Sequence, residues 1–267
     1  MAGLQRYTDR RVLITGGGSG IGQACVLRIL EEGGRVVAAD ISRSGLDDTV
    51  AKSGASGRLS TVLMDVADEE SVSTGVAAAV ETLGGLDTLV NVAGILRSGH
   101  FLETTLEQFE QVLRVNLVGT FLVIRAALPA LRSGTAPAVV NFSSTAANFA
   151  HPYMSAYAAS KGGVVGMTHA LAAEFAKEGI RFNAVQPGSI SSGMTDGTGE
   201  SKQSVGAGLP ADADFRLFAR VAPVLPLPDG ARFADPSAVA AVVAMLGSPE
   251  AFFITGTEVR IDGGAHV

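Results

Sequence analysis

Cysteine and histidine are scarce in this sequence, and their scarcity excludes several kinds of site. Cys25 is the only cysteine among 267 residues, so no disulfide can form within the chain. The histidines show no spacing typical of a metal site; they are His100, His151, His169 and His266. We therefore expect no metal centre and look for chemistry in other side chains.

Basic runs are missing as well. The chain has 20 lysines and arginines against 26 aspartates and glutamates, and its formal net charge is -6. Nothing in it would gather the phosphates of a nucleic acid. Charged residues make up only 17% and hydrophobic residues 47%, a composition that suits a sheet buried on both faces. The expected partner is a small molecule or a protein, not a nucleic acid.

A long apolar segment is also lacking. The longest uninterrupted apolar run, Ala238–Leu246, is too short to cross a bilayer. The first residues, MAGLQRYTDRR, lead into an apolar strand without the apolar core of a signal peptide. We predict a soluble, cytoplasmic protein with no membrane partner.

Short apolar runs alternate with longer helical patterns along the chain. The predicted strands cover residues 11–15, 35–39, 59–64, 87–91, 138–143, 180–186 and 257–261. The predicted helices cover residues 20–33, 45–53, 68–83, 104–131, 156–178 and 235–247. This alternation predicts the α/β class, with a doubly wound parallel sheet of about seven strands and helices on both faces. No linker or repeat divides the sequence, so residues 1–267 are predicted to form a single domain.

Residues 193–230 break the alternation. They are rich in glycine, proline and small polar residues, with room for a short helix that would carry Phe215, Leu217, Phe218 and Val221. A long insertion in a compact domain is usually a functional lid or a disordered loop. Because this one follows the sixth predicted strand, at the edge where open α/β sheets bind ligands, we predict a substrate lid. A loop without contact to substrate is the alternative.

A glycine-rich turn, TGGGSGIG at residues 15–22, separates the first predicted strand from the first predicted helix. Gly16 permits a tight turn, Gly20 keeps the helix start free of a Cβ that would meet a phosphate, and Gly22 lets the helix pack against the strand. The unpaired amides and positive dipole end of that helix, with the hydroxyl of Ser19, suit a pyrophosphate. The turn predicts a dinucleotide site, with a bare turn as the alternative.

A carboxylate stands at the end of the second predicted strand. Asp40 would accept hydrogen bonds from both hydroxyls of an adenosine ribose, and its charge would repel a 2′-phosphate. Arg43 could pair with such a phosphate, but the glycine turn itself contains no lysine or arginine. We predict NAD rather than NADP. The alternative is that Asp40 only caps the turn that follows it.

A tyrosine and a lysine lie one helical turn apart in SAYAASK, residues 155–161. Tyr157 and Lys161 share one face of the predicted helix at this spacing. A phenol with an ordinary pKa of about 10 is a poor base at neutral pH, but a nearby ammonium favours the phenolate. The pair predicts a general acid/base, although such a pair alone is more often a solvated helix face.

Further motifs in the same order resemble the short-chain dehydrogenase/reductase family, over residues 11–264. The matching residues are TGGGSGIG (15–22), Asp40, Asp65-Val66, Asn91-Val92-Ala93-Gly94, Asn116, Ser144, Tyr157, Lys161 and Pro187-Gly188. Ser144 precedes Tyr157 by thirteen residues, which is the usual separation in the family. Ser192 stands where the family commonly has a threonine.

The resemblance implies a Rossmann fold and a role for each matching residue. Tyr157 would be the general acid/base at the substrate oxygen, Ser144 would hydrogen-bond that oxygen, and Lys161 would bind the nicotinamide ribose and lower the pKa of Tyr157. Asn116 would hold a water that links Lys161 to solvent as a proton relay. The residues implied to bind the cofactor, besides Tyr157 and Lys161, are Gly16, Ser19, Gly20, Ile21, Gly22, Asp40, Asp65, Val66, Asn91, Ala93, Gly94, Pro187, Gly188, Ile190 and Ser192.

The activity implied by this resemblance is NAD-dependent interconversion of a secondary alcohol and a ketone. A hydrophobic or alicyclic substrate, such as a hydroxysteroid, a terpenoid or a cyclic diol, is favoured by apolar residues near the expected mouth, namely Phe149, Tyr153, Met194, Phe215, Leu217 and Phe218. The alternatives are a 3-oxoacyl-carrier-protein reductase and an NAD(H)-binding redox sensor without turnover. The resemblance also implies a homotetramer, formed through the helices at 104–131 and 156–178 and through residues 254–264.

Overall fold

The computed structural model of the chain describes residues 4–54, 56–192, 208–218 and 222–266. Its centre is a parallel sheet of seven strands in the order β3-β2-β1-β4-β5-β6-β7. The strands are β1 (Arg11–Thr15), β2 (Arg35–Asp40), β3 (Leu59–Leu63), β4 (Thr88–Asn91), β5 (Ala138–Phe142), β6 (Arg181–Pro187) and β7 (Glu258–Ile261). The predicted fold is confirmed, and each predicted strand ends within one residue of an observed one.

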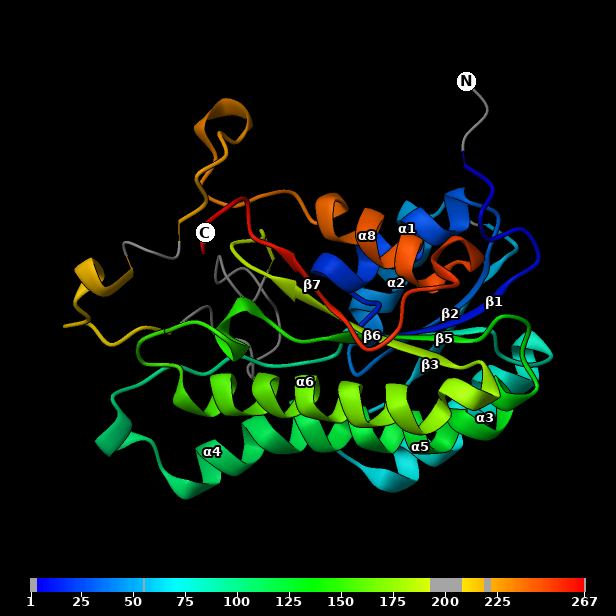
Figure 1. Cartoon of the computed structure of the whole chain (residues 1–267), viewed down its shortest axis with the longest axis horizontal. Helices are drawn as coiled ribbons and strands as arrows, with labels where there is room; N and C mark the ends of the chain where they lie inside the picture. The colour runs from blue at the N-terminus through cyan, green and yellow to red at the C-terminus, as the bar shows by residue number, and fades with distance from the viewer. Residues whose placement is uncertain (1–3, 55, 193–207, 219–221, 267) are drawn as a thin grey trace.

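Helices cover both faces of this sheet (Figure 1). They are α1 (Gly20–Glu31), α2 (Arg43–Lys52), α3 (Glu69–Leu83), α4 (Leu106–Leu113), α5 (Gly119–Arg132), α6 (Ser155–Phe175) and α8 (Ser237–Gly247). Helices α1, α2 and α8 pack on one face, and α3, α5 and α6 pack on the other. The sheet is therefore the middle of three layers.

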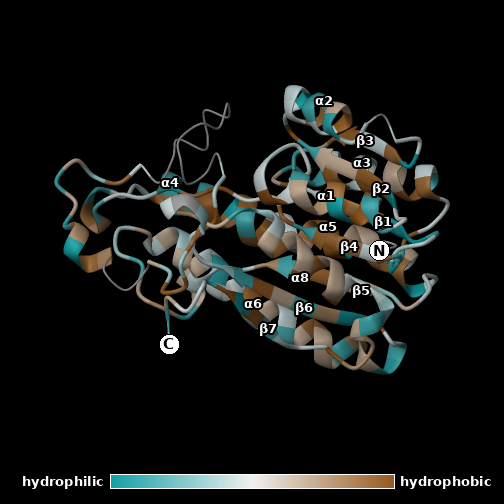
Figure 2. Cartoon of the chain, turned by 90° about the horizontal axis from the view of Figure 1, so that it is seen from above, coloured by the Kyte–Doolittle hydropathy of each residue, from teal (hydrophilic) through white to brown (hydrophobic). Residues whose placement is uncertain are grey.

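The central strands are buried on both faces, which explains their continuous apolar runs. In β1, Leu13 packs into the layer of α3, α5 and α6, whereas Val12 and Ile14 pack into the layer of α1 and α8. All three side chains are fully buried. Hydrophobic residues run through the central sheet in Figure 2, while α2 at its edge carries several hydrophilic ones.

The strand order reverses next to β1, and this reversal places the site. The chain proceeds from β1 to β2 and β3 on one side, then returns to β4 on the other side of β1. The loops that follow β1 and β4 therefore leave toward opposite faces of the sheet. A crevice opens between them at the carboxyl ends of the strands, where open α/β sheets bind ligands.

The helix predicted over residues 104–131 is divided in the structure. Helices α4 and α5 are joined by a π-helical segment, Arg114–Val118. Single π turns within α-helices often occur at functional sites, and here the turn holds Asn116, which is fully buried. The run Leu106–Arg132 is long and apolar enough to cross a membrane by composition alone, yet it packs against α3 and α6 as part of this fold.

The predicted lid is described only in part. Residues 193–207 and 219–221, which include Met194 and Val221, lie outside the described residues. The short helix is present as a 3-10 turn, Phe215–Phe218, in which the ring of Phe218 stacks on Tyr153 with their centroids 6.1 Å apart. The lid remains a prediction.

Candidate active site

The glycine turn lies between β1 and α1, as its motif requires. Gly16 and Gly20 have φ angles of 69° and 50°, in the left-handed region that favours glycine. A Cβ on Gly22 would lie 1.9 Å from the carbonyl oxygen of Gly16, so only glycine allows α1 to begin this close to the turn. The side chain of Ser19 makes no cap for the helix that follows. The first amides of α1 are thus directed at the crevice.

Asp40 lies beside this turn, at the end of β2. Its Oδ2 accepts a hydrogen bond from the backbone N–H of Gly18 at 2.9 Å, and its Oδ1 accepts one from the backbone N–H of Ser42 at 2.9 Å. Both bonds fix the orientation of the carboxylate. The carboxylate reaches the crevice in a set position, and it also caps the turn that follows β2.

A cleft of ≈ 720 Å³ runs along the carboxyl ends of the strands. Of the residues predicted for the cofactor and for catalysis, all except Asn91 and Asn116 line it. The glycine turn and Asp40 lie toward one end, and Ser144, Tyr157 and Lys161 toward the other. Residues from seven separate segments of the chain are thus brought together by the fold.

Asn91 supports the cleft from behind and does not line it. The side chain is buried, and its Nδ2 donates a hydrogen bond to Oδ1 of Asn141 on the neighbouring strand at 2.9 Å. Nδ2 of Asn141 donates in turn to Thr168 of α6 at 3.0 Å. This chain of amides joins β4, β5 and α6 below the reactive end of the cleft.

Sequence reasoning missed a polar group at the end of the cleft near Asp40. Gln23 of α1 and Asp48 and Lys52 of α2 all line the cleft there. The Nζ of Lys52 donates to Oε1 of Gln23 at 2.9 Å and pairs with the carboxylate of Asp48 at 2.7 Å. No local motif marks these residues, because they meet only when α1 and α2 pack together.

Ser144, Tyr157 and Lys161 form the polar group at the other end. Ser144 follows β5, and Tyr157 and Lys161 lie on the first two turns of α6. The side chain of Ser144 is hydrogen-bonded to that of Tyr157. The Nζ of Lys161 lies 5.6 Å from the centroid of the Tyr157 ring and donates to the carbonyl oxygen of Phe142 at 2.8 Å.

Burial sets the protonation of these groups. Burial raises the pKa of Tyr157, and the hydrogen bond from Ser144 lowers it in part. Burial also lowers the pKa of Lys161 to about 8, because the side chain is only 4% exposed and no carboxylate of the described residues pairs with it. A phenol and an ammonium ordinarily have similar pKa values, and burial moves them apart here by raising that of Tyr157 and lowering that of Lys161. An influence of Lys161 on the pKa of Tyr157 stays a prediction.

Asn116 joins the loop after β4 to α6. Its Oδ1 accepts from the backbone N–H of Ile95 at 2.8 Å, and its Nδ2 donates to the carbonyl oxygen of Ile95 at 2.9 Å and to Oγ of Ser160 at 3.0 Å. A Cβ on Gly94 would lie 3.1 Å from this Oδ1 and 3.4 Å from Nζ of Lys161. Glycine at this position lets the loop lie close to both polar side chains.

Comparison with known proteins agrees with this geometry. Residues 10–203 match the model of a family described as short chain dehydrogenase. Levodione reductase of Leifsonia aquatica is 36% identical over 263 residues, which are 97% of this chain and 95% of the relative. A 2,5-dichloro-2,5-cyclohexadiene-1,4-diol dehydrogenase of Sphingobium indicum is 35% identical over 263 residues, covering 98% of each chain.

Solved structures show the same likeness. The structure of a 3-ketoacyl-(acyl-carrier-protein) reductase from Brucella melitensis, complexed with NADH, matches with a TM-score of 0.82 and 28% identity. The match covers 97% of this chain and 99% of that one. Family model and full-length relatives thus agree on the family, and the solved structure agrees on the fold. The chain belongs to the short-chain dehydrogenase/reductase family, whose members are oxidoreductases that act on alcohols and ketones with a nicotinamide cofactor.

Proposed function

We propose that the protein is an NAD-dependent dehydrogenase that interconverts an alicyclic or otherwise hydrophobic secondary alcohol and its ketone. The observation that supports this most is the division of the cleft. One end presents the first amides of α1, glycines and a carboxylate; the other presents a serine, a tyrosine and a lysine, of which the serine and the lysine are buried. The two ends match the two parts of the proposed reaction, which are cofactor binding and proton transfer.

The residues of the cleft fit a dinucleotide. The first amides of α1 suit a pyrophosphate, and a Cβ on Gly16 would lie 2.8 Å from the backbone nitrogen of Ala93, so a side chain would push the two loops apart. Asp65 and Val66 line the cleft beside Asp40, where adenine would lie, and Ile190 and Ser192 line it near the nicotinamide end. When bound there, the nicotinamide accepts or supplies the hydride.

The remaining chemistry belongs to side chains of this protein. Tyr157 takes the hydroxyl proton from an alcohol, or gives a proton to the oxygen of a ketone. Ser144 holds that oxygen by a hydrogen bond, at a short distance from Tyr157. The ammonium of Lys161 lies next to the phenol and would bind the hydroxyls of the nicotinamide ribose. Ser144 and Lys161 are buried and Tyr157 is half-buried, which limits the access of water to the reacting atoms.

Asp40 supports NAD as the cofactor. Its carboxylate is fixed by two backbone amides and faces the cleft where the adenosine ribose would lie. A 2′-phosphate there would meet a negative charge. Among the residues that line this end, the cation is Lys52, which is already paired with Asp48. We infer a preference for NAD over NADP.

The preference for a ring-shaped substrate rests on two observations. One relative that matches over almost its full length acts, by its name, on a cyclohexadiene diol. Near the reactive end, Tyr153 and Phe218 stack on each other and present aromatic surface. Phe215 and Leu217 are largely exposed on the same short helix.

The cytoplasm is the compartment that we propose for this activity.

The direct test is the appearance of reduced nicotinamide when the purified protein meets NAD and a panel of cyclic and steroidal secondary alcohols. The variant Tyr157→Phe is the matched control, because it removes only the proton-transfer group. It should bind NADH nearly as well as the natural protein and lose most turnover.

Each other outcome has a defined meaning. A Tyr157→Phe variant with a near-normal rate would show that Tyr157 is not the acid/base. Tight NADH binding without turnover on a broad panel would favour a redox sensor. Rapid reduction of an oxoacyl thioester with NADPH, and no oxidation of cyclic alcohols, would favour a carrier-protein reductase.

A further inference from the structure

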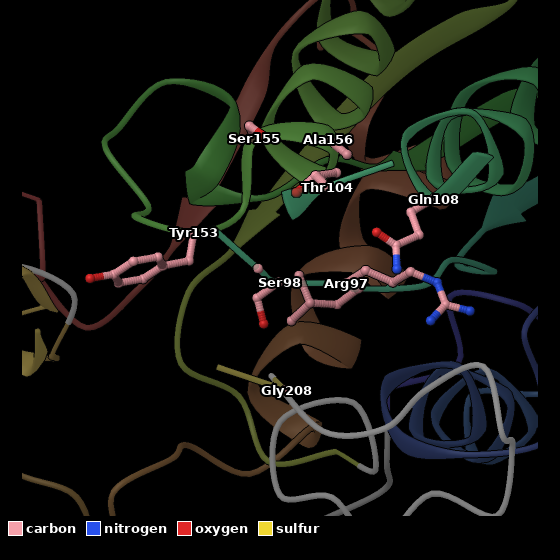
Figure 3. A pocket seen from close by; sticks show the side chains of 10 residues that line it. Arg97, Ser98, Thr104, Gln108, Tyr153, Ser155, Ala156 and Gly208 are labelled. Carbon is pink, nitrogen blue, oxygen red and sulfur yellow. The ribbon is translucent and has the colours of Figure 1, made fainter. Parts of the chain in front are cut away.

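A second cavity, of ≈ 240 Å³, lies next to the reactive end of the cleft. Figure 3 shows side chains that line it, from the loop after β4, from α4 and from the start of α6. The lining residues are Leu96, Arg97, Ser98, Gly99, Thr104, Gln108, Tyr153, Ser155, Ala156 and Gly208. Of these residues, Tyr153 alone was given a role above, as part of the aromatic surface near the reactive end.

Arg97 is the only charged side chain among these lining residues. Its Nε donates a hydrogen bond to Oε1 of Gln111 on α4 at 3.0 Å, which holds the guanidinium in place. Within the described part of the chain, no carboxylate forms an ion pair with Arg97. The guanidinium keeps further N–H groups besides Nε, and these can donate to an anion that reaches them.

Two further features of the cavity also favour an anion. The Oγ of Ser98 is buried and has no hydrogen-bond partner among the described residues. Helix α6 begins at Ser155, and its N-cap residue, Met154, offers no side-chain acceptor for the first amides of the helix. The cavity thus combines an arginine, an unpaired hydroxyl and the positive end of a helix of 21 residues.

The cavity and the cleft share a wall on two elements. In the loop after β4, Ile95 lines the cleft and the next residue, Leu96, lines the cavity. At the start of α6, Tyr157 lines the cleft and the preceding residue, Ala156, lines the cavity. The two spaces are therefore adjacent at both places, with neighbouring residues of one segment lining each.

We propose that the cavity binds an anionic group of the substrate, so that the protein acts on a hydroxy acid or keto acid whose carboxylate pairs with Arg97. Ser98 donates a hydrogen bond to the same carboxylate. This inference rests on the proposed dehydrogenase function, and it narrows the substrate from an alicyclic alcohol to one with a carboxylate on the ring. The carboxylate is not altered in the reaction; it orients the carbinol.

The test compares acids with their neutral esters. Hydroxycyclohexanecarboxylates with the hydroxyl at each ring position, and the methyl ester of each, are offered with NAD to the natural protein. We expect kcat/KM for at least one acid to exceed that for its ester by about tenfold to a hundredfold, the range of a charge-assisted hydrogen bond. The difference should lie mainly in KM, and added salt should reduce it.

Variants then assign the preference to Arg97. In Arg97→Met the ratio of kcat/KM for acid over ester should fall toward one, and in Arg97→Lys it should be partly retained. The control Arg35→Met removes one arginine at the start of β2, at the opposite end of the strands, and should leave the ratio unchanged.

The possible failures are distinguishable. If neutral alcohols are oxidised and no acid is preferred, the anion site is wrong and the dehydrogenase stands. If the natural protein oxidises neither acids nor esters nor other alcohols, the dehydrogenase itself is wrong. A preference for acids that survives in Arg97→Met would place the anion elsewhere. The comparison in the natural protein does not depend on how well any variant folds.

Discussion

Burial moves the ionisation of Lys161 well below its ordinary range. In the part of the chain that the structure describes, no carboxylate pairs with its ammonium, and burial lowers its pKa from 10.5 to about 8. The unfolded chain therefore binds a proton at a pH where the folded protein does not. As the pH falls from about 10.5 to about 8, the free energy of unfolding should decrease, and below that range the loss should be constant.

A comparison with Lys161→Met isolates this effect. Methionine has a similar length and no charge, so the stability difference between the two proteins contains little else that titrates. Urea unfolding at several pH values should show the natural protein losing stability relative to the variant as the pH falls through the range above. A pH-independent difference would mean that Lys161 keeps its ordinary pKa in the folded state.

Asp40 can be tested by a change that keeps its shape. Asp40→Asn retains one carbonyl oxygen for a backbone amide but removes the charge that would repel a 2′-phosphate. We expect the ratio of kcat/KM for NAD over NADP to fall by about tenfold or more, because a charge-assisted hydrogen bond to the ribose is lost. An unchanged ratio would show that Asp40 does not contact the ribose. A general loss of folding would lower both values and leave the ratio intact.

At the scale of elements, the turn between β1 and α1 depends on a glycine that has no room for a side chain. In Gly22→Ala the added Cβ would overlap the carbonyl oxygen of Gly16, so α1 must move away from the turn. We expect loss of NADH binding by at least about tenfold, together with lower stability. Gly162→Ala is a matched control in α6, since its Cβ would meet only Ala147 at 3.9 Å. NADH fluorescence titration and urea unfolding of both variants provide the measurements.

The elements also show how far local sequence patterns reach. Strands and helices were predictable because the central strands are buried on both faces and read as apolar runs. The π-helical segment around Asn116 could not be predicted from the sequence, because its residues continue the periodicity of an α-helix. Its wider turn accompanies the contacts of Asn116 with the loop after β4. Asn91 lies behind the cleft and does not line it, because successive side chains of a strand point to opposite faces of the sheet. The spacing of the motif does not show which of its side chains faces the cleft.

At the scale of the whole molecule, apolar side chains remain exposed on the surface of the single chain. Phe252 and Phe253, which lie between α8 and β7, are 78% and 91% exposed. They directly precede residues 254–264, through which family resemblance implies a subunit interface. Exposed aromatic residues next to such a segment fit the proposed homotetramer.

Sedimentation equilibrium tests this assembly. The natural protein should sediment at about four times the mass of one chain at micromolar concentration. Phe253→Asp should yield a smaller species, because a charge cannot be buried at an apolar contact. Sedimentation of the natural protein at the mass of one chain would contradict the tetramer, and an unchanged tetramer in the variant would exclude Phe253 from the interface.

The wall shared by the cleft and the second cavity has a consequence for stereochemistry. A substrate held by its carboxylate at Arg97 and by its oxygen at Tyr157 has two of its groups fixed in space. The hydrogen that is transferred from the carbinol carbon must then face the nicotinamide. Only one configuration at that carbon places the carboxylate, the oxygen and the hydrogen in these three positions together. A racemic hydroxy acid would therefore be consumed as one enantiomer, leaving the other behind in optically pure form.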